Sequence, residues 1–413
     1  MYGMKTYTFE EVKDFLAIDS LQQQILRLSL VNLVLVAVVG LVLRTLPFLP
    51  DVGIVYKNVL HGHSHFAFGG WVMPVLFGLF LRHFPGLSAK VPYHHWRNIA
   101  VLMFVSAYGM LLSFPVQGYQ AVSITFSTLS LISGFYWIGV LYKPMKEEAG
   151  SASISFLRWG LLYFVLSSIG PFATGPLIAM GKQGTPVYFD SIYFYLHFQY
   201  NGFFTFLVMA LLFRKLEQEK KLRYGKTFFR LMNAAVLPTY ALSILWHPHA
   251  FVWNFIGGIA AVVQLVALWY LAIELKPVLK TFLTPFYTLA AVAFVLKLVL
   301  QVASAFPAIA AMAFENRNFI IAYLHLVLLG FVSAFTFAWL FESARVRQYA
   351  NSFWLFFLSW LMMEMILVAQ AALAVENIEF PLVREALLVV TVFLFAGVFS
   401  ILSAWRRLNA VQL

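Results

Sequence analysis

Apolar residues fall in runs of about 20 along almost the entire chain, and short polar, proline- or glycine-containing segments separate the runs. A helix of that length crosses the hydrocarbon core of a bilayer. The runs predict twelve spans, at residues 26–47, 62–82, 97–114, 121–142, 156–179, 191–213, 228–246, 250–273, 281–303, 318–341, 352–374 and 384–405. The pattern therefore predicts an all-α integral membrane protein with twelve transmembrane helices.

Residues 1–25 form a polar lead-in before the first apolar run, so no cleavable signal peptide is expected. Phe9, Val12, Phe15 and Leu16 recur there at helical spacing, which indicates a short helix lying at the cytoplasmic membrane interface. We expect the whole chain, residues 1–413, to form a single transmembrane domain with this segment at its start.

Lysine and arginine divide unequally between the two sides of the predicted bundle. Of the 28, the side that holds both termini has 22, the opposite side has 5, and Lys297 lies inside a span. The positive-inside rule then places both termini in the cytoplasm. The same rule accounts for the net charge of +11. The basic run 214–230 is therefore interpreted as a cytoplasmic loop, and the expected partner is the lipid bilayer, not nucleic acid.

The chain is 62% hydrophobic and only 11% charged, and it has no cysteine. Without cysteine there is no disulfide, no thiolate-held iron–sulfur cluster and no haem attached through a Cys-x-x-Cys-His motif. Any bound metal must be held by histidine, methionine, tyrosine or carboxylate. Histidine inside a membrane is costly, so intramembrane histidines indicate a functional site.

Three of the ten histidines, His61, His63 and His65, lie at the start of the second span. On a helix His61 and His65 share a face, whereas His63 points about 200° away. One regular helix cannot aim all three at one metal, although it can offer a ligand on each flank. The alternative is three interfacial histidines bonded to loops and water.

Four more histidines fall in the same outer layer of the predicted bundle. His197 and His325 lie in the first third of the sixth and tenth spans, and His247 and His249 lie between the seventh and eighth. Pro248 disfavours helix at His247, so this pair is expected on a turn where two imidazoles converge. The alternative there is a capped helix end with exposed histidines.

An internal repeat relates three of these histidines. His65, His197 and His325 are each followed five residues later by a glycine, and four predicted spans separate one from the next. This spacing predicts a pseudo-threefold repeat of four-helix units. The glycine would let a flat ligand or a neighbouring helix approach closely.

Histidines that face one another across a helix bundle suit two kinds of site. One is a haem held between imidazoles on opposing helices. The other is copper held by three imidazoles, here His197, His247 and His249, with one position open for a small ligand.

With these histidines in place, the chain resembles the catalytic subunit I of the haem–copper oxidase superfamily, which includes cytochrome oxidases and nitric oxide reductases. It also resembles the NnrS family of haem- and copper-containing nitric-oxide-response proteins. Residues 197–202 are similar to the sixth-helix copper motif of nitric oxide reductases, and residues 247–249 to the pair that completes that copper site. His63, His65 and His325 stand on helices that carry haem ligands in the superfamily.

The resemblance implies one or two haems, of unknown type, and copper. It implies His61, His63, His65, His325 and Arg384 as haem-binding residues, with Arg384 pairing with haem propionates. It further implies a cytochrome c or quinol electron donor, additional membrane subunits, and a bacterial-type cytoplasmic (inner) membrane.

The chain also departs from the superfamily pattern. Asn201 stands where nitric oxide reductases have glutamate, and Tyr323 where a second tenth-helix histidine is usual. The expected function is a haem- and copper-binding protein that handles O2 or nitric oxide, with the choice between a reductase and a redox protein left open. The alternatives are a non-enzymatic NnrS-like protein and a transporter with a histidine-lined path. Lys297 and Glu364, the deepest charges, are expected to serve a proton path or to form an ion pair.

Overall fold

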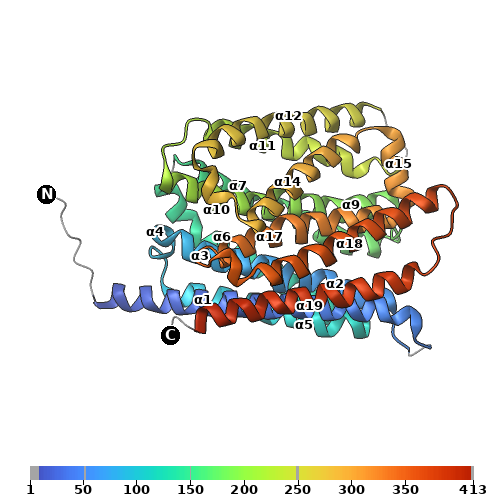
Figure 1. Cartoon of the computed structure of the whole chain (residues 1–413), viewed down its shortest axis with the longest axis horizontal. Coiled ribbons are helices and arrows are strands. Elements are labelled where there is room, and N and C mark those ends of the chain that lie inside the picture. The colour runs from blue at the N-terminus through green and yellow to red at the C-terminus, as the bar shows by residue number, and fades with distance from the viewer. Residues whose placement is uncertain (1–8, 51–52, 149, 248–250, 411–413) are drawn as a thin grey trace. The chain divides into compact units, whose positions relative to one another are not determined.

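The computed structural model describes residues 9–50, 53–148, 150–247 and 251–410, and every regular element in these ranges is a helix (Figure 1). The all-α prediction is confirmed. Within the same ranges, eleven helices are long and apolar enough to span a membrane. The predicted span 228–246 corresponds to α11 (Gly225–Thr239) and a 3-10 turn, η4 (Tyr240–Ile244), and this segment is not among the eleven.

The chain divides into two compact units, residues 1–150 and residues 151–413. Unit 1 contains α1 (Phe9–Thr45), η1 (Leu46–Phe48), α2 (Tyr56–Phe66), η2 (Ala67–Val72), α3 (Met73–His83), α4 (Pro85–Ser88), α5 (Tyr93–Gln117) and α6 (Ala121–Glu147). Helix α1 packs on α2 and α3, α2 packs on α5, and α5 packs on α6.

The start of α1 differs from the expected separate interfacial helix. Residues 9–25 are the first turns of one continuous 37-residue helix. The physical reason is local, because neither proline nor glycine occurs between Phe9 and Val39, and nothing breaks the backbone hydrogen bonding there.

Unit 2 contains α7 (Ala152–Ser167), α8 (Ile169–Ala179), α9 (Pro186–His197), η3 (Phe198–Phe204), α10 (Thr205–Glu219), α11, η4, α12 (Val252–Leu275), η5 (Lys276–Val278), α13 (Leu279–Phe282), α14 (Pro285–Ala303), α15 (Pro307–Glu315), α16 (Arg317–His325), η6 (Leu326–Ser333), α17 (Ala334–Leu340), η7 (Val346–Gln348), α18 (Ala350–Val375) and α19 (Val383–Ala410). Long helices pair as neighbours: α7 with α10, α11 with α12, and α18 with α19 (Figure 1).

Helix starts in unit 2 follow from sequence. Pro186 and Pro285 stand at the first position of α9 and α14, where the missing proline N–H has no intrahelical partner to lose. Ser151 caps α7, because its hydroxyl accepts from the Ile154 N–H at 3.1 Å. Between α7 and α8 the helix breaks at Ser168, three residues before Pro171.

Candidate functional site

Three of the predicted spans are interrupted by a π-helical segment, and a histidine comes just before each one. His65 lies two residues before η2, and His197 and His325 lie directly before η3 and η6. A π-helical turn inside an α-helix is rare and is frequently found at functional sites. We call each such histidine with the π segment that follows it a His–π element.

The wide turn of a π segment leaves backbone carbonyls without their usual hydrogen-bond donor. In the second and third His–π elements a side-chain hydroxyl supplies the missing donor. Thr205 Oγ1 donates to the Tyr200 carbonyl at 2.6 Å, and Ser333 Oγ donates to the Leu328 carbonyl at 2.7 Å. In both cases the hydroxyl stands eight residues after the histidine and the carbonyl three residues after it.

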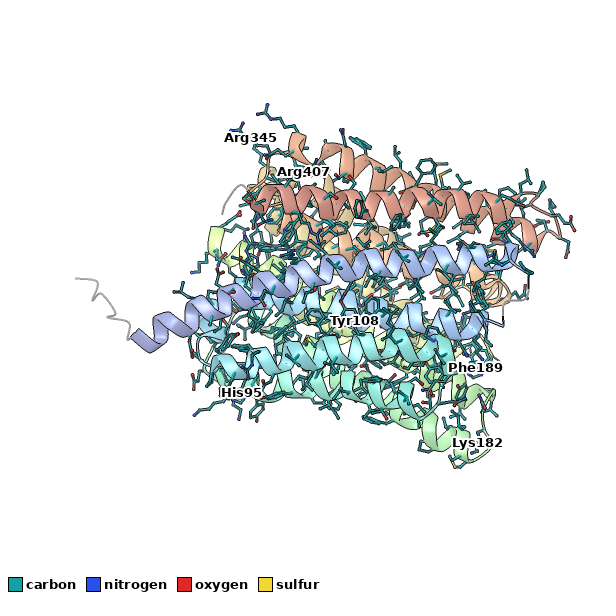
Figure 2. The ribbon with its side chains drawn as sticks, turned by 90° about the horizontal axis from the view of Figure 1, so that it is seen from below. His95, Tyr108, Lys182, Phe189, Arg345 and Arg407 are labelled. Atoms are coloured by element: carbon teal, nitrogen blue, oxygen red, sulfur yellow. The ribbon has the colours of Figure 1, made fainter. Side chains whose placement is uncertain are left out.

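In the first His–π element a neighbouring helix supplies the donor. Asn32 of α1 donates from Nδ2 to the Gly70 carbonyl at 2.7 Å, and Tyr108 of α5 donates its hydroxyl to Asn32 Oδ1 at 2.6 Å. Tyr108 lies near mid-length of α5, whereas His95 lies near the start of that helix (Figure 2). Asn32 is fully buried inside unit 1, whereas Tyr108 is half-buried.

The glycine five residues after each histidine lies against an aromatic side chain. A Cβ at Gly202 would lie 2.6 Å from Cβ of Tyr163 on α7, and a Cβ at Gly330 would lie 2.7 Å from the Trp360 ring on α18. The prediction that this glycine allows close approach of a neighbouring helix is confirmed at both positions. At Gly70 the close neighbour is the Phe66 ring of the same span, at 2.6 Å.

His61 and His65 share a face of α2, as predicted, and both lie against the same two aromatic residues. His65 stacks on Phe114 with ring centroids 4.4 Å apart, and its Nε2 lies 2.7 Å from the Tyr119 hydroxyl. His61 meets the Tyr119 ring edge to face at 4.7 Å. The structure therefore brings His61 and His65 together at the junction of α5 and α6.

His63 points to the other flank of α2, toward α1. A Cβ at Gly40 would lie 3.3 Å from His63 Cε1, so the absence of a side chain at Gly40 makes room for the imidazole. Nδ1 of His63 is buried and makes no hydrogen bond to any of the described residues. An imidazole nitrogen in this state is suited to accept a ligand.

His197 is buried, and protein groups engage both of its ring nitrogens. Nε2 lies 2.9 Å from the Val236 carbonyl, and Nδ1 lies 3.1 Å from Asn201 Nδ2 and 3.4 Å from Ser243 Oγ. A carbonyl only accepts and an amide nitrogen only donates, so Nε2 carries the proton. His197 could bind a metal only by exchanging one of these bonds.

His247 is held by a carboxylate that the sequence had not singled out. Its Nε2 lies 3.1 Å from Asp190 Oδ2, and Trp246 Nε1 donates to Asp190 Oδ1 at 3.1 Å. Asp190 follows Phe189 on α9, at the end of the helix near the connection that carries Lys182 (Figure 2). His249 lies outside the described residues, so its relation to His247 is not described.

His325 also faces a carboxylate. Its Nδ1 lies 3.6 Å from Oε1 of Glu364 on α18, which is longer than a hydrogen bond but within the range of an ionic contact. Close by, the Tyr323 ring meets the Tyr200 ring edge to face at 6.0 Å. This contact joins the second and third His–π elements inside unit 2.

Of the two roles expected for Lys297 and Glu364, a proton path or an ion pair, the ion pair is not formed. Lys297 Nζ donates to Gln301 Oε1 at 2.9 Å on its own helix, and Glu364 makes its ionic contact with His325. Lys297 and Glu364 therefore each contact a different partner and do not contact each other. Among the described residues no group of three or more histidine or acidic side chains has the arrangement of a metal site.

Arg384, expected to pair with propionates, is exposed in the first turn of α19. Two partners of the histidines were missed from sequence. Tyr119 carried no signal, because it lies 54 residues beyond His65. Asp190 did carry one, since it is an acidic residue at the very edge of an apolar span.

No protein-family model matches this chain, and no curated protein sequence matches it. The fold and the local geometry of the histidines therefore carry the functional argument alone.

Proposed function

We propose that this chain is a multi-pass membrane haem protein that handles a diatomic gas, O2 or nitric oxide, as a reductase or redox protein. The observation that carries the proposal is the threefold occurrence of the His–π element. A histidine, a π segment and a close-packed glycine recur together at His65, His197 and His325. This supports the pseudo-threefold repeat of four-helix units on which the resemblance to the haem–copper oxidases rests.

The residues fit haem better than they fit copper. Imidazoles are the usual axial ligands of haem iron, and ligating imidazoles commonly hold their second nitrogen against a protein acceptor. Nδ1 of His63 is buried and has no hydrogen bond within the described chain, and Nδ1 of His325 lies beside the carboxylate of Glu364. We assign His63, His65 and His325 as the residues that would hold haem iron, with His61 as the neighbour of His65.

A bound haem would supply a one-electron redox centre and a binding site for the gas. The residues of the chain supply the surroundings. Phe114 stacks on the His65 ring, and the Tyr119 hydroxyl at Nε2 fixes the orientation of that ring. Both termini are proposed to lie on the cytoplasmic side of a bacterial-type membrane, because the basic loops gather there.

Copper does not fit the described residues as they stand, because both nitrogens of His197 are hydrogen-bonded to protein. We therefore derive no chemical step through copper. The copper content of the wild type and of the His197→Ala, His247→Ala and His249→Ala variants tests the site. Loss of copper in all three supports the predicted ligand set, and full occupancy in all three contradicts it.

The haem content of purified protein tests the proposal. Protein expressed with sufficient haem supply is expected to contain haem in a fixed ratio to chain, and His325→Ala is expected to lower that ratio. His83→Ala is the matched control, because His83 ends α3 beyond the first π segment and has no assigned role. Wild-type protein without haem would contradict the proposal.

Carbon monoxide and nitric oxide binding separate a gas-handling haem from a closed one. Reduced protein with an open axial position binds carbon monoxide and shifts its Soret band. A protein with haem but with no response to either gas would favour the alternative, a non-enzymatic NnrS-like role.

A transporter is the second candidate, and two observations favour it. The helix break between α7 and α8 at Ser168 and the buried Lys297–Gln301 pair on α14 are both typical of substrate or proton paths. Uptake of protons or labelled solute into vesicles containing the protein tests this function. Uptake that is lost in Lys297→Met but kept in His325→Ala would support transport over haem chemistry.

A further inference from the structure

We infer that Glu364 is the positioning residue of His325 and sets the reduction potential of the haem iron that His325 binds. The inference rests on the proposed function and assigns to Glu364 a role that neither the resemblance nor the sequence had given it.

The first step is the geometry of the pair. His325 is the last residue of α16, and Glu364 lies midway along α18, a helix that packs on α16. Oε1 of Glu364 lies 3.6 Å from Nδ1 of His325, and the side chains are 13% and 24% exposed.

The second step is that α18 is held in register with the third His–π element. Trp360 lies one turn before Glu364 on α18, and its ring packs where a side chain at Gly330 would otherwise stand. Because Gly330 follows His325 by five residues on the same span, this contact fixes the carboxylate opposite the imidazole.

The third step is that no cation competes for the carboxylate. Within the described ranges no lysine or arginine lies in ion-pair distance of Glu364, and Lys297 is bonded to Gln301. A carboxylate buried inside a membrane bundle is costly unless a partner accepts its charge. The Nδ1–H of His325 is the group in place to do so.

The fourth step is chemical. A carboxylate opposite Nδ1 selects the tautomer that carries its proton there, which leaves the Nε2 lone pair for iron. The negative charge of the carboxylate, 3.6 Å from Nδ1, polarises the Nδ1–H bond, so the imidazole donates more electron density through Nε2. Greater donation stabilises the oxidised iron and lowers the reduction potential of the haem.

The test is a redox titration of haem in the full-length protein. Glu364→Gln keeps the side-chain size but removes the charge, and we expect the midpoint potential to rise. A tenfold increase in the ratio of reduced to oxidised haem corresponds to a rise of about 59 mV in the midpoint potential for one electron. Glu376→Gln is the matched control, because Glu376 is exposed at the end of the same helix.

Glu364→Asp adds a second measurement that does not depend on recovery of the glutamine variant. It keeps the charge but withdraws the carboxylate by one methylene, so we expect a smaller rise in potential. A potential that is unchanged in Glu364→Gln, or in Glu364→Asp where only that variant folds, would overturn the role of Glu364. Absence of haem from the wild type would instead overturn the proposed function itself.

Discussion

Gly202→Ala tests whether the close helix approach at a His–π element is required for the fold. The new methyl group would lie 2.6 Å from Cβ of Tyr163, about 0.8 Å inside ordinary van der Waals contact. A Cβ atom is fixed to its backbone and cannot rotate away, so helix α7 itself must move. Movement of α7 also strains the hydrogen bond of the Tyr163 hydroxyl to Asn233 Oδ1, now 2.9 Å long.

The magnitude follows from these two effects. Overpacking typically costs about 1–3 kcal/mol, a weakened hydrogen bond about 1 kcal/mol, and the better helix propensity of alanine returns about 1 kcal/mol. The net loss of about 2 kcal/mol corresponds to a fall in Tm of about 4–8 °C. Thermal unfolding in detergent, followed by helical circular dichroism, measures it.

The matched control is Gly139→Ala, where no atom lies within 4 Å of the new methyl group. The control is expected to unfold at or slightly above the wild-type temperature. Equal unfolding temperatures for Gly202→Ala and Gly139→Ala would refute the reasoning, because they would mean that α7 does not approach this closely.

Three further predictions concern polar contacts. Asn32→Leu removes a buried hydrogen bond to Gly70 and a part-buried one from Tyr108, and is expected to cost about 2 kcal/mol in unfolding free energy; an unchanged denaturation midpoint would contradict it. Lys215→Met breaks the contact with Glu342 at 2.5 Å and is expected to cost about 1–2 kcal/mol in the same assay, because Glu342 keeps some solvent, whereas exposed Lys221→Met should have no effect. The hydrogen bond to Glu148 raises the pKa of Lys90 above 10.5. The small contribution of this ion pair to stability is therefore complete below pH 10.5 and is lost as the pH rises through the higher pKa of the folded state. The difference in Tm between wild type and Lys90→Met should shrink over that pH range.

The spans could be predicted from sequence because apolar length alone decides them. Eleven of the twelve predicted runs correspond to helices long enough to cross a bilayer within the described residues. The histidine–glycine spacing also carried information, since Gly202 and Gly330 do accept side chains of neighbouring helices. Local pattern and elementary sterics were sufficient for these features.

The π segments and the carboxylate partners could not be predicted in the same way. A π turn depends on which carbonyl an N–H reaches, and no residue type encodes that choice. An ion pair of Glu364 with Lys297 was one of two expectations, because both are deep charges, but helix rotation decides which face each one presents. Packing of Trp360 against Gly330 turns Glu364 toward His325 instead.

The reduced-minus-oxidised absorption spectrum of the purified protein tests haem binding most directly. The account predicts a Soret band that shifts on reduction in the wild type and in Gly139→Ala, and that is lost or displaced in His325→Ala. Wild-type protein that folds, is supplied with haem during expression and shows no Soret absorption in either redox state would contradict the account.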